Sequence, residues 1–510
     1  MWTPSSWGSS RGVAILLGAA ASVAAPVANA QERAGAPTTG DDTTPMPVPD
    51  ELTRAQPGGV TADQAGARAA QTSWSARASM ESLRGAAARV DEAWAAFLPR
   101  LSAVGKYTRL SNFTAPSIFN VPGNLVGTTA GPAGLLAPGD ITSGKAPLFS
   151  TPVDFSFPFF VLDNWLLQAT ISIPISDYFL RIEQNYTAAT NSQEAARWDV
   201  ATARAGSEAN GRIAYYTWLN ARGSVVVAVQ ALNDQKTHLR DARNQFAAGN
   251  ASKADVLRAE TAVASAELTL ERAKNLSDLS EKQLRVAMHA SEGEVLSPGE
   301  NLDSTVPPVQ GNLKQMTLEA LSSRPEIRSA DANASVAHEQ AAAARAQRWP
   351  VVSAFGDGIL GNPNPRYIPP SNVWNTTWDV GAQVTWSPND VLTANGNVRD
   401  IESRVAVIEA NKNVTRDNIE VEVTQMLQQV HEADFSIESS TRELASAQEA
   451  YRVQRELFNN GRGTSTTLAD AESDLTRARL DLLNAKVSAR TARIRLEHAL
   501  GRDARPIAAQ

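Results

Sequence analysis

Residues 378–386 have the sequence Trp-Asp-Val-Gly-Ala-Gln-Val-Thr-Trp, so apolar and polar positions alternate, with a tryptophan at each end. Alternation with a period of two is typical of a β-strand with one apolar and one polar face. At ~3.3 Å per residue the tryptophans are ~26 Å apart, or ~20 Å after a tilt near 40°. A soluble, half-buried sheet would alternate in the same way, but the aromatic pair favours a strand that crosses an outer membrane.

A matching strand is predicted at about 165–176, where Leu167, Ala169, Ile171 and Ile173 form the apolar set. Two further strands, at about 98–110 and 350–360, alternate less cleanly. We expect three tryptophans at strand ends to face lipid as an aromatic girdle: Trp165, Trp378 and Trp386. We expect the polar side chains of both clean strands to face water, namely Gln168, Thr170, Ser172, Asp379, Gln383 and Thr385.

Four strands are too few to close a barrel with an open interior. An open sheet edge in lipid would leave backbone groups unpaired, at several kcal/mol each. Several copies of the chain must therefore contribute strands. Three copies would supply twelve strands, an even number that leaves room for a channel, so a homotrimer is predicted.

Two very long helical stretches follow the strand pairs, at about 178–245 and 391–457. Each would be ~100 Å long if unbroken, which no globular core requires. The returning helices are predicted at about 252–290 and 464–500, and the latter repeats Leu468, Leu475, Leu482, Ala489 and Leu496 every seven residues. This heptad pattern indicates close packing of helix on helix, and an ordinary coiled-coil dimer would show it too.

The order of elements occurs twice, which predicts a duplication. Residues 99–105 are echoed by 350–356, and Phe246 and Gly249 are echoed by Phe458 and Gly461. Chance similarity between Ala-rich helices could explain the helical matches, but not the strand matches in the same order. We assign a first repeat to 60–313, with a helical-hairpin tip near 246–255 and a non-helical equatorial insert at 291–313. A second repeat spans 314–510, with its tip near 458–470. Helices are also predicted at about 60–97 and 314–347, and residues 111–163 are predicted to form a long loop rich in Gly, Pro and Asn.

The first thirty residues have the layout of a secretory signal peptide. Arg11 precedes an apolar run at 13–25, and Ala28-Asn29-Ala30 forms a small-x-small cleavage site. An N-terminal membrane anchor is the alternative, but the apolar run is short for one. Residues 31–59 form a Pro/Thr-rich lead-in with no predicted function. No later stretch resembles a transmembrane helix, so membrane insertion is expected to use strands.

The composition excludes several classes of function. Lys and Arg number 47 against 54 Asp and Glu, a net charge of −7, so a nucleic-acid partner is not expected. The chain has no cysteine, which excludes thiol catalysis, disulfides and cysteine-based zinc sites. The hydrophobic fraction of 43% is too large for wholesale disorder.

Several motifs resemble those of the TolC-type outer-membrane efflux protein family, and the resemblance covers nearly the whole mature chain. The turns at 246–256 and 458–464 are similar to the hairpin tips of that family, and 320–327 is similar to another of its signatures. Each motif is weak alone, but their order and spacing are specific. The resemblance implies a homotrimer with a twelve-stranded β-barrel and a periplasmic helical barrel. It also implies that the tip docks onto a periplasmic adaptor (membrane fusion) protein and an inner-membrane pump.

The family narrows its tip with rings of acidic and hydrogen-bonding residues. By motif position, the resemblance implies such a periplasmic gate here at Asp255 and Asp470, with Phe458 and Arg462 beside them and Gly249 and Gly461 at the turns. Carboxylates from three chains around one axis would repel, attract cations and raise each other's pKa. The alternative is that each acid is solvated or caps a helix. The chain departs from the family pattern at Thr467, Gly463 and Phe458. The sequence therefore does not predict which interactions close the tip.

Signs of catalysis are weak. Residues 139–145 fit GxxxxGK, but Ala146 stands where a phosphate-binding loop needs a hydroxyl residue. The five histidines are scattered, without a pair at metal-ligand spacing: His238, His289, His338, His431 and His498. We therefore expect no enzyme activity, no cofactor and no metal.

The sequence predicts a mostly helical protein with membrane β-strands, which acts as a passive outer-membrane exit duct. Substrates would come from the pump across the periplasm, for tripartite efflux or for type I secretion. The alternative is a structural coiled-coil envelope protein without a pore. Drugs, metals and proteins all remain open as cargo, because the pump selects it.

Overall fold

The computed structural model describes residues 54–112, 119–121, 153–155, 161–291 and 293–504. These residues belong to one compact unit, Pro45–Gln510. The predicted signal peptide at 1–30, the lead-in as far as residue 53 and the GxxxxGK stretch at 139–145 lie outside the described residues.

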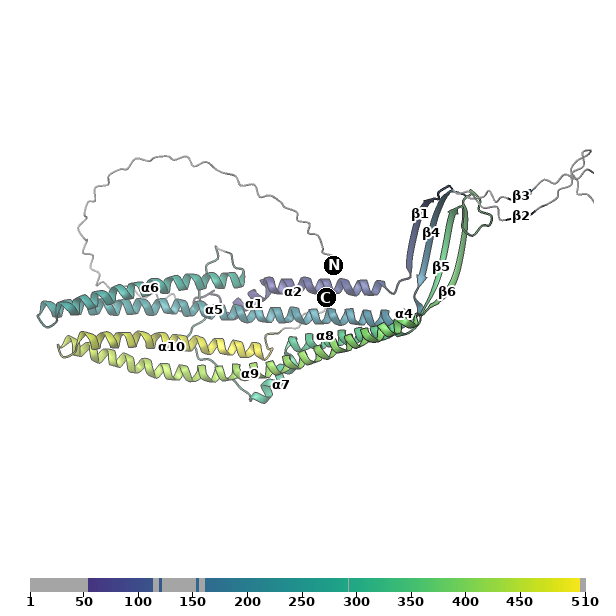
Figure 1. Cartoon of the computed structure of the whole chain (residues 1–510). Helices are drawn as coiled ribbons and strands as arrows, with labels where there is room; N and C mark the ends of the chain where they lie inside the picture. Colours follow the sequence, from purple (N-terminus) through teal and green to yellow (C-terminus); the bar gives the residue numbers. More distant parts are fainter. Residues whose placement is uncertain (1–53, 113–118, 122–152, 156–160, 292, 505–510) are drawn as a thin grey trace, which may run out of the picture. The chain divides into compact units, whose positions relative to one another are not determined.

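Four strands form one antiparallel sheet in the order β1-β4-β5-β6 (Figure 1). Its strands are β1 (Arg100–Arg109), β4 (Asp163–Ile173), β5 (Val351–Asn362) and β6 (Asn375–Thr385). Each predicted strand hairpin is present, and β4 pairs with β5 to join the two hairpins. A second, two-stranded sheet pairs β2 (Phe119–Val121) with β3 (Val153–Phe155), inside a segment where the sequence predicts only loop.

The register of the sheet gathers the apolar set on one face. Tyr107 lies opposite Trp165, and Gly358 lies opposite Trp378. Trp378 and Val380 are each 77% exposed, so this face is uncovered in the single chain. Phe355 lies on the other face, where a Cβ added to Gly381 would sit 2.7 Å from its ring. Phe355 of β5 can therefore lie on the polar face, because Gly381 of β6 opposite it leaves space for the ring. This explains why apolar and polar residues alternate irregularly in β5.

Two long helices each follow a strand hairpin. The first, α5 (Glu183–Ala247), begins after the short helical turns α4 (Ile175–Asp177) and η2 (Tyr178–Ile182) and pairs with α6 (Lys253–Met288). The second, α9 (Pro388–Asn459), pairs with α10 (Ser465–Ala499). The lengths of 65 and 72 residues correspond to about 100 Å each. Figure 1 shows both helix pairs running side by side.

Three predicted boundaries need correction. The helix expected from 60 to 97 is two helices, α1 (Ala62–Thr72) and α2 (Trp74–Ala95), because the Ser73 side chain caps a new helix. The helix expected at 314–347 divides into α7 (Leu313–Ser323) and α8 (Pro325–Arg345), followed by the short turn η3 (Ala346–Arg348). Proline cannot continue a helix but readily begins one, so the division falls at Arg324. The strand expected to reach 176 ends at Ile173, because Pro174 precedes a helical turn.

The helices pack through rows of small and aliphatic side chains. In the half of the helices that contains the turns, α6 contacts α5, α5 contacts α10, and α10 contacts α9. Buried Val256, Ala259, Val263 and Leu270 of α6 meet α5, at the spacing that the heptads predict. Leu296 and Leu302 of the non-helical insert pack against Tyr215 and Trp218. Among the described residues no helix has both the length and the apolarity to span a bilayer.

Candidate functional site

Two glycines make the turns that join each pair of long helices. Gly249 has φ of +80° and Gly461 has φ of +68°, values in the left-handed region that favours glycine. Their amides donate to the carbonyl oxygens of Phe246 and Phe458, each at 3.0 Å. Gly249 and Gly461 therefore lie in turns between helices. Asp255, Arg462 and Asp470 follow these turns in the sequence, whereas Phe458 precedes Gly461.

Asp255 caps the helix that begins after the first turn. Its carboxylate accepts hydrogen bonds from the Ser252 hydroxyl at 2.7 Å and amide at 3.0 Å, and the Ser252 hydroxyl accepts from the Asp255 amide. This reciprocal capping box is the helix-capping alternative that the sequence leaves open. These hydrogen bonds lower the pKa of Asp255, so within one chain the carboxyl is ionised more readily than usual. The raised pKa expected for an acidic ring is not a property of the single chain.

Asp470 and Arg462 are both exposed at the second turn. Asp470 lines a cavity of ≈ 640 Å³ between α9 and α10, together with Thr467 and Asp474. The Thr467 hydroxyl donates to the Thr464 carbonyl at 2.9 Å, next to the cap of α10. Asp470 is thus free to face solvent or a neighbouring chain, as a gate role requires.

Phe458 does not share this exposed position. Its side chain is 5% exposed, and its ring meets the His238 ring edge-on at 5.4 Å between centroids. The structure therefore places Phe458 in the core beside the turn and not on the surface with Asp470 and Arg462.

Next to Phe458 lies a buried polar cluster that the sequence does not reveal. His238 Nδ1 is 3.0 Å from Glu472 Oε2, and His238 Nε2 is 3.3 Å from Ser465 Oγ. Burial raises the pKa of Glu472, and the hydrogen bond from His238 partly offsets this effect. The cluster joins α5 to α10, and the ion pair of Asp234 with Arg479 at 2.9 Å joins the same helices. It therefore links the two helical hairpins near their turns.

The connection Ser465–His238–Glu472 has the order of a catalytic triad, but its surroundings do not suit catalysis. The three side chains are only 3–4% exposed, and Ser465 is the first residue of α10. A nucleophile has to reach a substrate carbonyl, whereas these atoms face one another across a helix interface. The cluster therefore satisfies buried polar atoms and fixes the packing of the hairpins.

The polar face of the sheet carries its own hydrogen-bonded network. Asp357 accepts hydrogen bonds from the Thr170 hydroxyl and from Gln168 Nε2, the latter at 3.0 Å. Arg366 forms an ion pair with Asp379 at 2.5 Å. Gln168, Thr170 and Asp379 are three of the residues that the sequence assigns to the wet face. Across the described residues, no group of three or more His, Asp or Glu side chains is placed to hold a metal ion.

Comparison with protein families gives one match, to the family described as outer membrane efflux protein. The matched residues are 161–289 and 317–502, which together are more than half of the chain. No curated protein sequence matches the chain.

Three solved structures with a similar fold are distant from this chain in sequence. CusC, whose description concerns folding and transmembrane channel formation, is 17% identical with a TM-score of 0.70 over 89% of this chain and 97% of its own. The outer membrane channel CmeC of Campylobacter jejuni is 14% identical with a TM-score of 0.66 over 90% and 92%. The outer membrane protein VceC of Vibrio cholerae is 18% identical with a TM-score of 0.65 over 86% and 96%. At these sequence identities, the comparison shows similarity of fold alone.

Proposed function

The chain belongs to the outer membrane efflux protein family, and we propose that it works as a homotrimeric duct fed by an inner-membrane pump. The family is one of outer-membrane exit channels, and the absence of enzyme activity belongs to the proposal. The trimer, the closed barrel, the extension into the periplasm and the pump are the other proposed parts. The free sheet edges and the exposed helix faces of the single chain support the trimer and the barrel.

The observation that carries the proposal is the pair of free sheet edges. β1 and β6 are the outer strands of the four-stranded sheet, and consecutive strands in it are antiparallel. An edge strand leaves a row of unpaired backbone groups, which lipid cannot satisfy. With this strand order, β6 of one copy can pair antiparallel with β1 of the next. Three copies then close a barrel of twelve strands.

The helices show a matching pair of free faces. Along α9 four exposed apolar side chains recur at multiples of seven: Val407, Val414, Val421 and Phe435. Along α6 another exposed row follows the face opposite to α5: Leu257, Leu268, Leu279 and Val286. Because α6 and α9 end the helix layer on its two sides, these rows support side-by-side packing of copies.

The proposed path runs from the helix turns to the polar face of the sheet. Asp255 and Asp470 lie beside the turns, where we place a narrow acidic gate and the docking surface for the adaptor. The polar side chains Gln168, Thr170, Ser172, Asp379, Gln383 and Thr385 would keep the barrel wet. Trp165, Trp378 and Trp386 would meet lipid at the rims. The energy for transport would come from the pump, which also selects the cargo.

The test is the mass of the full-length protein, extracted from outer membranes in detergent and measured by native mass spectrometry. A trimer that needs detergent to stay dispersed is the expected result. A protein that stays in solution as a monomer or dimer without detergent would contradict the proposal. That result would favour the structural coiled-coil alternative.

A further inference from the structure

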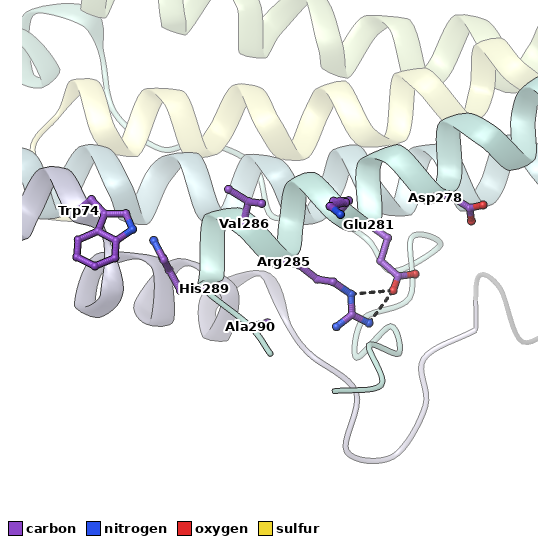
Figure 2. A pocket seen from close by; sticks show the side chains of 8 residues that line it. Trp74, Asp278, Glu281, Arg285, Val286, His289 and Ala290 are labelled. Carbon is purple, nitrogen blue, oxygen red and sulfur yellow. Dashed lines mark hydrogen bonds and ion pairs between the residues drawn. The ribbon is translucent and has the colours of Figure 1, made fainter. Parts of the chain in front are cut away.

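A cavity of ≈ 690 Å³ lies where α6 ends and α2 begins, and we name it the Trp74 pocket (Figure 2). Trp74, Lys282, Val286 and His289 are among its lining residues. Trp74 is 65% exposed and Val286 is 64% exposed, although Ala76 and Leu284 on the same helices are buried. Figure 2 shows Trp74 beside His289, and the two rings meet edge-on at 5.7 Å between centroids. The pocket therefore offers an aromatic wall with no cover in the single chain.

The contacts within one chain fix which part of α9 lies at the height of this pocket. Arg493 of α10 forms an ion pair with Asp434 of α9 at 2.8 Å. The next residue, Ile494, packs in one core cluster with Leu284 and Met288 of α6. Phe435, which follows Asp434, thus lies at the height of the last turns of α6. Rotation of copies about an axis along the helices preserves this height.

Phe435 can occupy the Trp74 pocket because of the size of its ring, its position on α9 and the charged residues beside it. Its ring is 65% exposed and belongs to the apolar row of α9 that faces away from α10. Glu432 and Glu438 flank it at three residues on either side, so they share its face, and both are exposed. The pocket is lined by acids as well as bases, and Glu281 already forms an ion pair with Arg285 at 2.7 Å. Lys282 is the lining base that can pair with Glu432 or Glu438. The ring cannot fill the pocket of its own chain, because α5 and α10 lie between α6 and α9.

We propose that the Trp74 pocket is completed by Phe435 of the neighbouring copy, with Glu432 or Glu438 beside Lys282. The inference rests on the proposed trimer and assigns the register of its helical interface. Packing of the Phe435 ring against Trp74 and Val286, which are 65% and 64% exposed, removes apolar surface of both partners from water. The contact fastens adjacent copies where the interrupted helices α1 and α2 meet α6.

The test uses the natural absence of cysteine from the chain. Val286→Cys is combined in turn with Val421→Cys, Gln428→Cys, Phe435→Cys and Arg442→Cys in the full-length protein in detergent, and the products of mild oxidation are separated without reductant. A disulfide needs Cα atoms about 4.4–6.8 Å apart. Successive positions on α9 differ by seven residues, or ~10.5 Å. We therefore expect a covalent trimer with Phe435→Cys and at least a tenfold lower yield with Val421→Cys and Arg442→Cys.

The outcomes separate this inference from the proposed function. A maximum at Val421→Cys, Gln428→Cys or Arg442→Cys, or no cross-link at any position, overturns the inference when native mass spectrometry of the same variants shows a trimer. A monomer in that measurement overturns the proposed trimer, and the inference falls with it. Each single-cysteine variant serves as the control for random collision, and both parent side chains are exposed, so neither change removes a packed residue of the fold.

Discussion

Glu472 is buried together with His238 between two helices from different halves of the chain. Glu472→Ala leaves the His238 ring without its partner, which costs about 1–3 kcal/mol for a buried polar group. We expect Glu472→Ala to lower the melting temperature, measured by circular dichroism in detergent. Asp470→Ala is the matched control, because Asp470 is an exposed acid two residues away on the same helix. Equal melting temperatures for the two variants would show that the buried cluster does not hold the hairpins together.

His498 gives the chain a pH dependence at the end of α10. Asp503 accepts a hydrogen bond from His498 Nδ1 at 2.7 Å and raises the pKa of His498 above its ordinary value of 6.5. The folded state therefore holds this proton more tightly than the unfolded state. The resulting stability is complete below pH 6.5 and is lost as the pH rises through the folded-state pKa.

We expect the melting temperature of the natural protein to fall more steeply than that of Asp503→Asn as the pH rises from about 6 to about 8. The variant removes the carboxylate that raises the pKa of His498, so it removes this part of the slope. Melting curves at several pH values make the comparison. Parallel slopes would show that the pair contributes nothing to stability in this range.

At the scale of elements, the two helix turns depend on backbone conformation. Gly249→Ala places a side chain at φ of +80°, and the left-handed region costs an L-residue about 1–2 kcal/mol. Gly206→Ala is the control in the middle of α5, where alanine stabilises a helix by roughly 0.5–1 kcal/mol. Neither added Cβ meets another atom within 4 Å, so only the backbone differs. We expect opposite shifts in melting temperature, and shifts of the same sign would contradict this account.

Most elements could be predicted because their signals are local. The alternation at 378–386 and the heptads of α10 depend on residues that are close in sequence, and both elements are present. The break before Pro325 could also have been predicted, because proline disfavours a helical conformation at the residue before it, but we expected one continuous helix at 314–347. The capping box of Ser252 and Asp255 is a four-residue pattern and could have been assigned from the sequence.

The buried cluster could not be predicted in this way. His238 and Glu472 are 234 residues apart, and only the packing of one hairpin on the other brings them together. The burial of Phe458 could not be predicted either, because a turn motif does not show which side its aromatic ring faces. Its ring lies in the core and not at the expected gate. The Trp74 pocket likewise depends on where α2 begins. The sequence alone predicts one longer helix from about residue 60, whereas α2 begins at Trp74.

At the scale of the whole molecule, we propose that the acids beside the turns set the preference for ions. Three copies around one axis would bring Asp255 and Asp470 of every chain to the narrow end. We expect Asp255→Asn combined with Asp470→Asn to reduce cation selectivity, measured as the reversal potential under a salt gradient. Glu271→Gln combined with Glu449→Gln removes the same charge from exposed sites farther from the turns and should leave selectivity unchanged. The same reversal potential for both double variants would contradict an acidic gate.

The central claim is that several copies of this chain close a pore that spans a membrane. Single-channel current through a planar lipid bilayer, with the purified full-length protein, tests it most directly. We predict small, stable current steps that favour cations, because the proposed path is wet in the barrel and narrow beside the acidic turns. The claim would be contradicted if protein shown to be folded and inserted in the bilayer gave no current steps.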